Sequence, residues 1–271
     1  MFVAILFFSG TGNTYYVAKT LQDSLQRLGH LCDLQAIEQL KDQPIDVSVY
    51  DVIGLGFPVY GSSVPSLVKD YIKLLQGKNK SAFCFVTQMM YSGDGAAYGG
   101  RLLKKQGFVV DVQMHFNMPN NITDVKFLQL FHRIPYDKIR LRVQRKVDFI
   151  LSRILNKRPY KLGSNPISLI LGLLQRVPYE RYERVLLPGV VKVNQHDCIH
   201  CGLCISLCPV QNLISMNEVI TDQGQCMTCY RCINHCPTSA LTLVGKSKVE
   251  RPYKGPTPTF DVSELKKHHL Q

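Results

Sequence analysis

The sequence has 271 residues, of which 45% are hydrophobic, and a net charge of +12 at pH 7. This length is sufficient for two domains with separate cores. The longest apolar stretch outside the first strand covers residues 167–174 and is interrupted by Ser168 and Gly172. It is far shorter than the ~20 residues that a membrane-spanning helix needs. Because the start of the chain also lacks a charged and then apolar signal segment, we expect a cytoplasmic protein without a transmembrane helix.

The chain begins with an apolar run at residues 2–8, which predicts a parallel strand buried on both faces. A loop of glycines and hydroxyl residues follows, without Lys or Arg, and leads into a helix expected over residues 14–28 and ended by Gly29. Backbone N–H groups and a helix N-terminus can hold a phosphate without a counter-cation. The loop has neither the Gly-Lys-Ser/Thr of a Walker loop nor the Gly-x-Gly-x-x-Gly of a dinucleotide loop. The predicted phosphate-binding residues are Ser9, Gly10, Thr11, Gly12, Asn13 and Thr14.

Strands and helices alternate after this loop. Further strands are expected at residues 52–57, 82–87 and 109–116, and helices at residues 66–75 and 96–106. This alternation predicts a doubly wound parallel sheet, an α/β fold. In such a sheet ligands bind beyond the carboxyl ends of the strands, where the loops at residues 9–14, 57–63 and 87–95 lie.

Residues 125–187 match neither the sheet pattern nor the cysteine-rich segment that follows. Apolar residues recur at helical spacing over residues 125–155, with a break at Pro135, and a short helix is expected over residues 168–176, ending before Pro178. We expect these helices to pack between the two domains. The competing interpretation is a helix on a membrane surface, with Leu169, Ile170, Leu173 and Leu174 toward the lipid.

Most of the positive charge lies in this segment. Residues 133–184 contain thirteen Lys or Arg against four Asp or Glu, a local excess of +9. A basic surface can bind nucleic acid, an anionic membrane or an acidic protein. Nucleic acid is not expected, because no zinc finger, ribonucleoprotein motif or helix-turn-helix is recognisable. The default interpretation is a solvated helix face, and a small acidic redox protein is the partner that it would attract.

Two copies of one cysteine pattern, Cys-x2-Cys-x2-Cys-x3-Cys-Pro, lie 28 positions apart near the C-terminus. In such a run three cysteines bind one 4Fe-4S cluster and the fourth binds the other cluster. The predicted ligand sets are therefore crossed. The first set is Cys198, Cys201, Cys204 and Cys236, and the second is Cys226, Cys229, Cys232 and Cys208.

Zinc and disulfide bonds explain this pattern less well. Zinc sites use paired Cys-x2-Cys units and have no need of a third cysteine and a Cys-Pro in each run. A disulfide framework is typical of small secreted proteins. The remaining cysteines, Cys32 and Cys84, are expected to be buried core thiols.

The loop Ser9-Gly10-Thr11-Gly12-Asn13-Thr14 after the first strand resembles the FMN-phosphate loop of flavodoxins, and the whole chain resembles the flavodoxin–ferredoxin fusion family found among anaerobes. The resemblance covers about residues 1–120 and 188–245. It implies a flavodoxin-like sheet of strand order 2-1-3-4-5, bound FMN, and a small α+β ferredoxin domain with two 4Fe-4S clusters. The implied domains are residues 1–124 for FMN, a basic helical connector at 125–187, the ferredoxin domain at 188–246 and a tail at 247–271.

The resemblance also implies which loops flank the flavin ring. They supply Pro58, Val59, Tyr60 and Gly61 on one side and Thr87, Gln88, Met89, Tyr91, Gly93, Asp94 and Gly95 on the other. Because the chain has no Trp, ring stacking would come from Tyr60 or Tyr91. Asp94 is interpreted as a solvated turn carboxylate that could weaken a reduced, anionic flavin by charge repulsion.

A flavin takes two electrons and each cluster passes one, so the sequence predicts an electron-transfer protein that couples one-electron and two-electron partners. The partner would be a redox protein, such as an acidic ferredoxin, or a small-molecule electron acceptor. An alternative is an FMN-dependent reductase of a quinone, enone or nitro compound. The sequence does not set the catalytic residues, the direction of electron flow or the oligomeric state.

Overall fold

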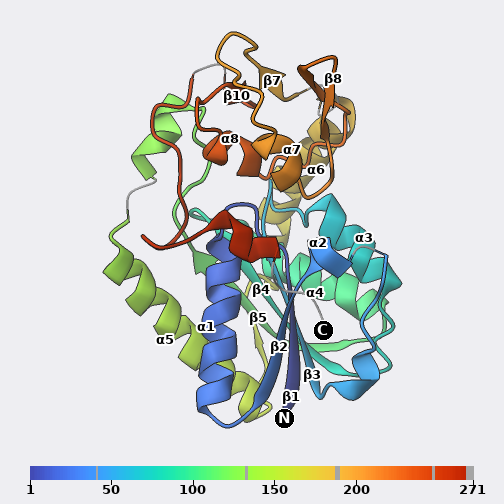
Figure 1. The fold of residues 1–271 in the computed structure, drawn as a ribbon. Helices are drawn as coiled ribbons and strands as arrows, with labels where there is room; N and C mark the ends of the chain where they lie inside the picture. The colour runs from blue at the N-terminus through green and yellow to red at the C-terminus, as the bar shows by residue number, and fades with distance from the viewer. Residues whose placement is uncertain (41, 132–133, 187–189, 246–247, 267–271) are drawn as a thin grey trace.

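The computed structural model describes residues 1–40, 42–131, 134–186, 190–245 and 248–266. Within these residues a parallel sheet of six strands forms the centre of the N-terminal half, in the order β2-β1-β3-β4-β5-β6 (Figure 1). The predicted doubly wound sheet of order 2-1-3-4-5 is confirmed, and β6 adds a short edge strand that the sequence pattern did not predict. The strands are β1 (Phe2–Phe7), β2 (Leu31–Ala36), β3 (Val52–Pro58), β4 (Ser81–Gln88), β5 (Val109–Asn117) and β6 (Tyr160–Lys161).

Helices cover both faces of this sheet. Alternate residues of β1 enter different cores, because side chains along a strand point to opposite faces. Ile5 packs under α1 (Asn13–Arg27) and α5 (Tyr136–Leu155), and Leu6 packs under α3 (Ser66–Leu74) and α4 (Gly95–Lys105). The uniformly apolar first strand is therefore explained by burial on both sides. The short α2 (Ile37–Leu40) follows β2.

The proline at 135 separates two helical pieces. The segment before it forms only a 3₁₀ turn, η2 (Lys126–Phe131), and α5 begins directly after Pro135. The α5 residues Ile139, Val143, Val147 and Ile150 are buried at helical spacing and share a core with α1 and the sheet. Helix α5 therefore belongs to the helical layer that covers this face of the sheet, next to α1.

The prediction that the second helix ends before Pro178 is wrong. Instead α6 (Pro166–Leu186) includes Pro178. A proline lacks the N–H that bonds to the carbonyl four residues earlier, so it weakens the middle of a helix. The residues beyond it are held by tertiary contacts, since Glu180 pairs with Lys69 of α3 at 2.7 Å. This tertiary contact outweighs the tendency of Pro178 to end the helix.

The cysteine-rich segment, residues 190–245, forms a small α+β domain at the carboxyl edge of the sheet (Figure 1). Its core contains Val191, Leu213, Ile220, Ile233 and Leu241. The elements are β7 (Lys192–Val193) paired with β10 (Leu241–Thr242), β8 (Leu213–Met216) paired with β9 (Val219–Asp222), α7 (Leu203–Leu207) and α8 (Arg231–His235).

The tail, residues 248–266, returns from this small domain to the sheet domain and lies across the start of α1 (Figure 1). It ends in η3 (Val262–Lys266), whose Leu265 is fully buried in the core beneath α1. The expected domain boundaries at 187 and at 246–247 fall outside the described residues. In the described part of the chain, none of the helices has the length and apolar character needed to cross a bilayer.

The basic segment is divided between surface and interior. Arg140, Arg142 and Arg145 are exposed on α5, whereas Arg176 of α6 is buried. Arg133 lies outside the described residues. The charge excess of this segment is therefore only partly available to a partner.

A buried ion pair joins α6 to the loop before α4. Asp94 is fully buried, and its carboxylate lies 3.0 and 3.2 Å from the guanidinium of Arg176 and also contacts Arg101. A methyl group at Gly172 would collide with this carboxylate, so only glycine lets α6 approach so closely. The interpretation of Asp94 as a solvated turn carboxylate is wrong, because the distant α6 covers it.

The Asp94→Asn variant should lose about 3–5 kcal/mol of unfolding free energy, because Arg176 would keep its charge in a buried site without a counter-charge. Anaerobic urea unfolding followed by circular dichroism measures this loss. Asp70→Asn is the control, since the Asp70–Lys73 pair is exposed and should change stability by less than about 1 kcal/mol. Equal losses in the two variants would contradict the structural role of Asp94.

Candidate functional site

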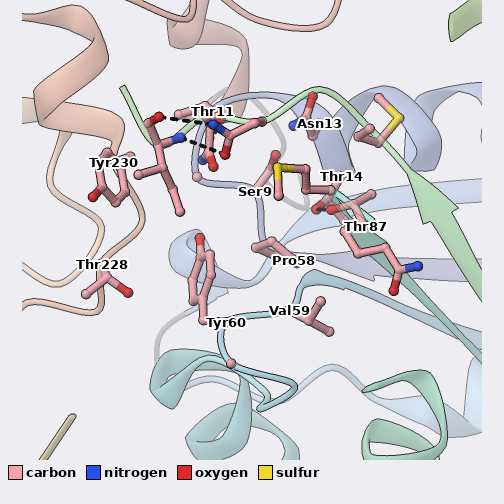
Figure 2. A pocket seen from close by; sticks show the side chains of 18 of the residues that line it. Ser9, Thr11, Asn13, Thr14, Pro58, Val59, Tyr60, Thr87, Thr228 and Tyr230 are labelled. Carbon is pink, nitrogen blue, oxygen red and sulfur yellow. Dashed lines mark hydrogen bonds between the residues drawn. The ribbon is translucent and has the colours of Figure 1, made fainter. Parts of the chain in front are cut away.

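A cavity of about 380 Å³ lies beyond the carboxyl ends of β1, β3 and β4. Figure 2 shows side chains of the first loop, of Tyr60 and of the cysteine-rich domain around it. The structure brings three predicted loops together here, as the topology of a parallel sheet requires. The predicted residues that line the cavity are Ser9, Gly10, Thr11, Asn13, Thr14, Pro58, Val59, Tyr60, Gly61, Thr87, Gln88 and Met89.

Other lining residues were not predicted from the sequence. Met118, Pro119, Asn120, Asn121 and Ile122 follow β5, so the rule that placed the other loops would also have found them. The remaining wall comes from α6 and from the cysteine-rich domain. It consists of Tyr179, Tyr182, Thr228, Tyr230 and Val244. No local sequence pattern predicts contacts between residues that lie so far apart along the chain.

The hydroxyl groups of the first loop are nearly fully buried and hydrogen-bonded. The backbone N–H of Gly12 donates to Ser9 Oγ at 3.1 Å, and Asn121 Nδ2 donates to Thr11 Oγ1 at 3.0 Å. Thr14 Oγ1 lies 2.8 Å from the hydroxyl of Thr87 in β4. These hydrogen bonds hold the first loop against Asn121 and Thr87.

The N-terminus of α1 is suited to an anion. Gly12 caps it at φ 96° and, as a glycine, has no side chain that could accept a hydrogen bond from the first turn. The first turn also carries no acidic residue. The backbone N–H groups and the positive end of the helix dipole thus remain available to a phosphate.

Arg231 of α8 reaches from the cysteine-rich domain to this loop. Its guanidinium donates to the carbonyls of Ser9 at 2.7 Å and Gly10 at 2.9 Å, and it pairs with both carboxylate oxygens of Glu38. Burial alone would lower the pKa of Arg231, but Glu38 outweighs burial and holds the pKa above its ordinary value. In a trans peptide the N–H points opposite to the C=O. The N–H groups of Gly10 and Thr11 therefore point away from Arg231.

The tail covers the outer side of the loop. Tyr253 Oη donates to Asn13 Oδ1 at 2.6 Å. A methyl group at Gly12 would collide with Phe260 and Pro256, and Gly12 itself does not line the cavity. The loop is thus enclosed between Arg231 and the tail.

Tyr60 has a buried hydroxyl that meets no hydrogen-bond partner within the described part of the chain. It lies 3.1 Å from the point where a β-carbon at Gly10 would stand, and the Cys229 β-carbon is 3.2 Å from the same point. Burial raises the pKa of Tyr60 well above its ordinary value, so the hydroxyl is a donor at neutral pH. Because an unpaired buried donor is costly, a ligand in the cavity is expected to accept its hydrogen bond.

Four other predicted residues lie away from the cavity lining. Tyr91 is half exposed, and its hydroxyl lies 3.3 Å from Ser168 Oγ. Gly93 packs against the backbone of α6, Asp94 forms the buried ion pair, and Gly95 begins α4. In this arrangement Tyr60, rather than Tyr91, is the predicted aromatic residue that faces the cavity.

The eight clustered cysteines surround small cavities in the same sets that the sequence motif implies. One cavity is lined by Cys198, Cys201, Cys204 and Cys236, and another by Cys208, Cys226, Cys229 and Cys232. Cys32 and Cys84 are buried in the sheet domain, which confirms their assignment as core thiols.

The donor set of each cavity fits an iron–sulfur cluster. The backbone N–H groups of Asn212 and Ala240 donate to Cys208 Sγ at 3.1 Å and Cys236 Sγ at 3.3 Å, a kind of bond that stabilises cluster thiolates. Among the described residues, no three His, Cys, Asp or Glu converge closely enough to hold one metal ion. The four thiols of each set line one small cavity.

The two cysteine sites differ in their position relative to the large cavity. Cys229 is buried and packs into the core of the sheet domain together with Met227, while its neighbours Thr228 and Tyr230 line the large cavity. In the other site Cys201 is exposed. One site is therefore close to the cavity and the other is close to solvent.

Comparison with protein families identifies two separate parts of the chain. A model described as a flavodoxin domain matches residues 4–152, and one described as a 4Fe-4S dicluster domain matches residues 197–240. The chain matches no curated protein.

Several solved structures are similar to part of the chain. A two-electron reduced flavodoxin of Megasphaera elsdenii is 26% identical, with 46% of this chain and 94% of that chain covered and a TM-score of 0.37. The oxidised flavodoxin 2 of Bacillus cereus is 18% identical, with 56% and 99% covered and a TM-score of 0.40. A Lactobacillus acidophilus flavoprotein in complex with FMN is 15% identical, with 42% and 92% covered and a TM-score of 0.35.

The flavodoxin match alone spans more than half of the chain, and the second match falls on the cysteine-rich domain. The protein therefore belongs to the flavodoxin-domain family, as a fusion of an N-terminal flavodoxin domain with a C-terminal 4Fe-4S ferredoxin domain.

Proposed function

We propose that this protein transfers electrons between FMN in the 380 Å³ cavity and two 4Fe-4S clusters held by the crossed cysteine sets. FMN exchanges two electrons and each cluster one, so together they couple one-electron and two-electron partners. One observation carries the proposal. Thr228 and Tyr230, on either side of the cluster ligand Cys229, form part of the wall of the flavin cavity.

The order of the sites follows from their burial. The set with Cys229 is proximal to the flavin cavity, because Cys229 packs against the flavodoxin core. The set with Cys201 is distal and reaches the surface, where Ile199 and Leu203 are also exposed. An external redox protein would thus exchange electrons at the distal site.

The size of the cavity favours electron transfer over reduction of a bound organic substrate. Cofactor and small-molecule sites span ~300–1,000 Å³, and this cavity of about 380 Å³ lies near the lower limit. It suits one nucleotide-sized ligand.

The basic face of α5 would act on a partner only at a distance. Arg140, Arg142 and Arg145 are exposed, whereas Lys146 is half-buried and donates to the backbone oxygen of His115 at 2.6 Å. Because α5 packs on α1, away from the ferredoxin domain (Figure 1), these arginines do not adjoin the distal cluster. They would raise the encounter rate with an acidic ferredoxin without forming its docking contact.

Anaerobically purified protein should contain about eight irons and about eight sulfides per chain, because two four-cysteine sites are encoded. Cys208→Ala should abolish the paramagnetic signal of one reduced cluster and Cys201→Ala that of the other, whereas Cys84→Ala should retain the full iron content. About four irons in the unmodified protein, or loss of the same signal in the first two variants, would contradict the two crossed sites.

The Glu38→Leu/Arg231→Met double variant should bind FMN about tenfold or more weakly. The variant removes both buried charges together, so no unpaired charge is left in the interior. It also loses the hydrogen bonds that orient the carbonyls of Ser9 and Gly10, each worth about 1.5–3 kcal/mol when the donor is charged. Fluorescence titration of flavin-free protein measures the affinity, with the exposed Asp70→Asn/Lys73→Gln pair as control. Unchanged affinity at full iron content would mean that Arg231 does not shape the phosphate loop.

Tyr60→Phe should have opposite effects with and without FMN. Without flavin the variant should be more stable by about 1–3 kcal/mol, because an unpaired buried hydroxyl is removed. With flavin it should bind FMN up to about tenfold more weakly, because a hydrogen bond to the ligand is lost. Tyr179→Phe serves as a control, since the Tyr179 hydroxyl already bonds to Thr228. Equal or tighter FMN binding by Tyr60→Phe would exclude a bond from Tyr60 to the flavin.

A further inference from the structure

The first three turns of α6 have an unusual distribution of side chains. The buried stripe consists of Ser168, Gly172 and Arg176, spaced by four residues. Gly172 fits against Asp94, and Arg176 pairs with it. The helix thus packs on the flavodoxin domain through small and charged residues, whereas a surface helix normally buries its apolar side.

The opposite side of the helix is apolar and exposed. The exposed apolar residues, called here the outer face of α6, recur at helical spacing and are Ile167, Ile170, Leu171, Leu173, Leu174 and Val177. Ile167 is 70% exposed and Leu174 66%. Such exposure cannot be explained by isolated surface residues, and a contiguous apolar patch marks an interaction site.

The loop that packs beside α6 also exposes large side chains. Met90 and Tyr91 are exposed, and the Tyr91 hydroxyl lies 3.3 Å from Ser168 Oγ of the helix. A half-exposed tyrosine next to apolar side chains is typical of membrane–water interfaces. This loop therefore adds exposed apolar surface and a polar aromatic residue on the side of α6 that carries Ser168.

The charges around the outer face distinguish among candidate partners. Residues 166–177 contain no acid, and their one base, Arg176, is buried. Lys157, Arg158 and Lys161 precede the helix in sequence and are exposed, and Lys161 also pairs with Asp111 at 3.7 Å. Arg181, in the part of α6 beyond Pro178, is exposed as well. This arrangement complements anionic lipid headgroups. A second copy of the chain fits less well, because each copy carries a net charge of +12 and would repel the other.

We propose that the outer face of α6 docks the protein on an anionic membrane surface, with the helix lying in the plane of the interface. Residues 166–177, which carry the outer face, span ~18 Å at 1.5 Å per residue, and within the described residues no helix can span a bilayer. The contact is therefore peripheral and reversible. Of the residues expected to face the lipid, Ile170, Leu173 and Leu174 are exposed and Leu169 is half-buried. Ile167, Leu171 and Val177 join them on the exposed side.

Sedimentation of the complete, cofactor-loaded protein with lipid vesicles tests this proposal. The protein should bind phosphatidylcholine vesicles that contain roughly one-quarter phosphatidylserine, bind pure phosphatidylcholine vesicles less, and dissociate as salt rises. Ile170→Gln/Leu174→Gln should bind the anionic vesicles at least tenfold more weakly. Leu28→Gln/Val49→Gln is the matched control, because these exposed apolar residues lie elsewhere, and it should bind like the unmodified protein.

A second variant tests the electrostatic part of the proposal. Lys157→Glu/Arg158→Glu should weaken binding to the anionic vesicles severalfold and leave the outer face intact. Absence of vesicle binding by the unmodified protein, or binding that is equal in the Ile170/Leu174 variant, would overturn the proposal. The proposal would also be overturned if the unmodified protein sedimented as a dimer and the Ile170/Leu174 variant as a monomer. A second copy of the chain would then cover the outer face. These outcomes do not depend on the route of the electrons.

Discussion

The buried guanidinium of Arg231 is the interaction on which the arrangement of the two domains depends. A buried arginine is tolerated only when its charge and its N–H groups are satisfied, and Glu38 together with the carbonyls of Ser9 and Gly10 satisfies them. All three belong to the flavodoxin domain, whereas Arg231 lies between two cysteines that line one cavity. The segment around the proposed proximal cluster site therefore also fixes the loop at residues 9–14, the proposed phosphate site.

Much of the site follows from local sequence, and the rest from contacts between distant segments. The loop at Ser9–Thr14 and the cysteine runs were predictable, because spacing and residue type within a few positions define them. Tyr179 and Tyr230 join the cavity only through packing of domains that are far apart in sequence. The same distant packing carries α6 past Pro178 and buries Asp94, so local rules of helix ending and turn solvation gave the wrong answer there.

The enclosure of the proposed flavin cavity has consequences for its chemistry. The tail covers the outer side of the phosphate loop through Tyr253 and Phe260, and α6 contributes Tyr179 on another side. A flavin held there would be shielded from large external partners, while the proximal cysteine site shares its wall. Helix α6 thus has separate roles on its two sides, one toward the cofactors and one toward the surroundings of the protein.

The most direct test of electron transfer within one chain is the rate at which the flavin is reduced after single electrons are delivered rapidly to the anaerobic holoprotein. We expect first-order flavin reduction, followed by absorbance, with a rate that stays constant when the protein is diluted, because the proximal site and the flavin cavity share residues of one chain. A rate that falls in proportion to the protein concentration would show that electrons move between molecules, and would contradict the proposed route through the fused domains.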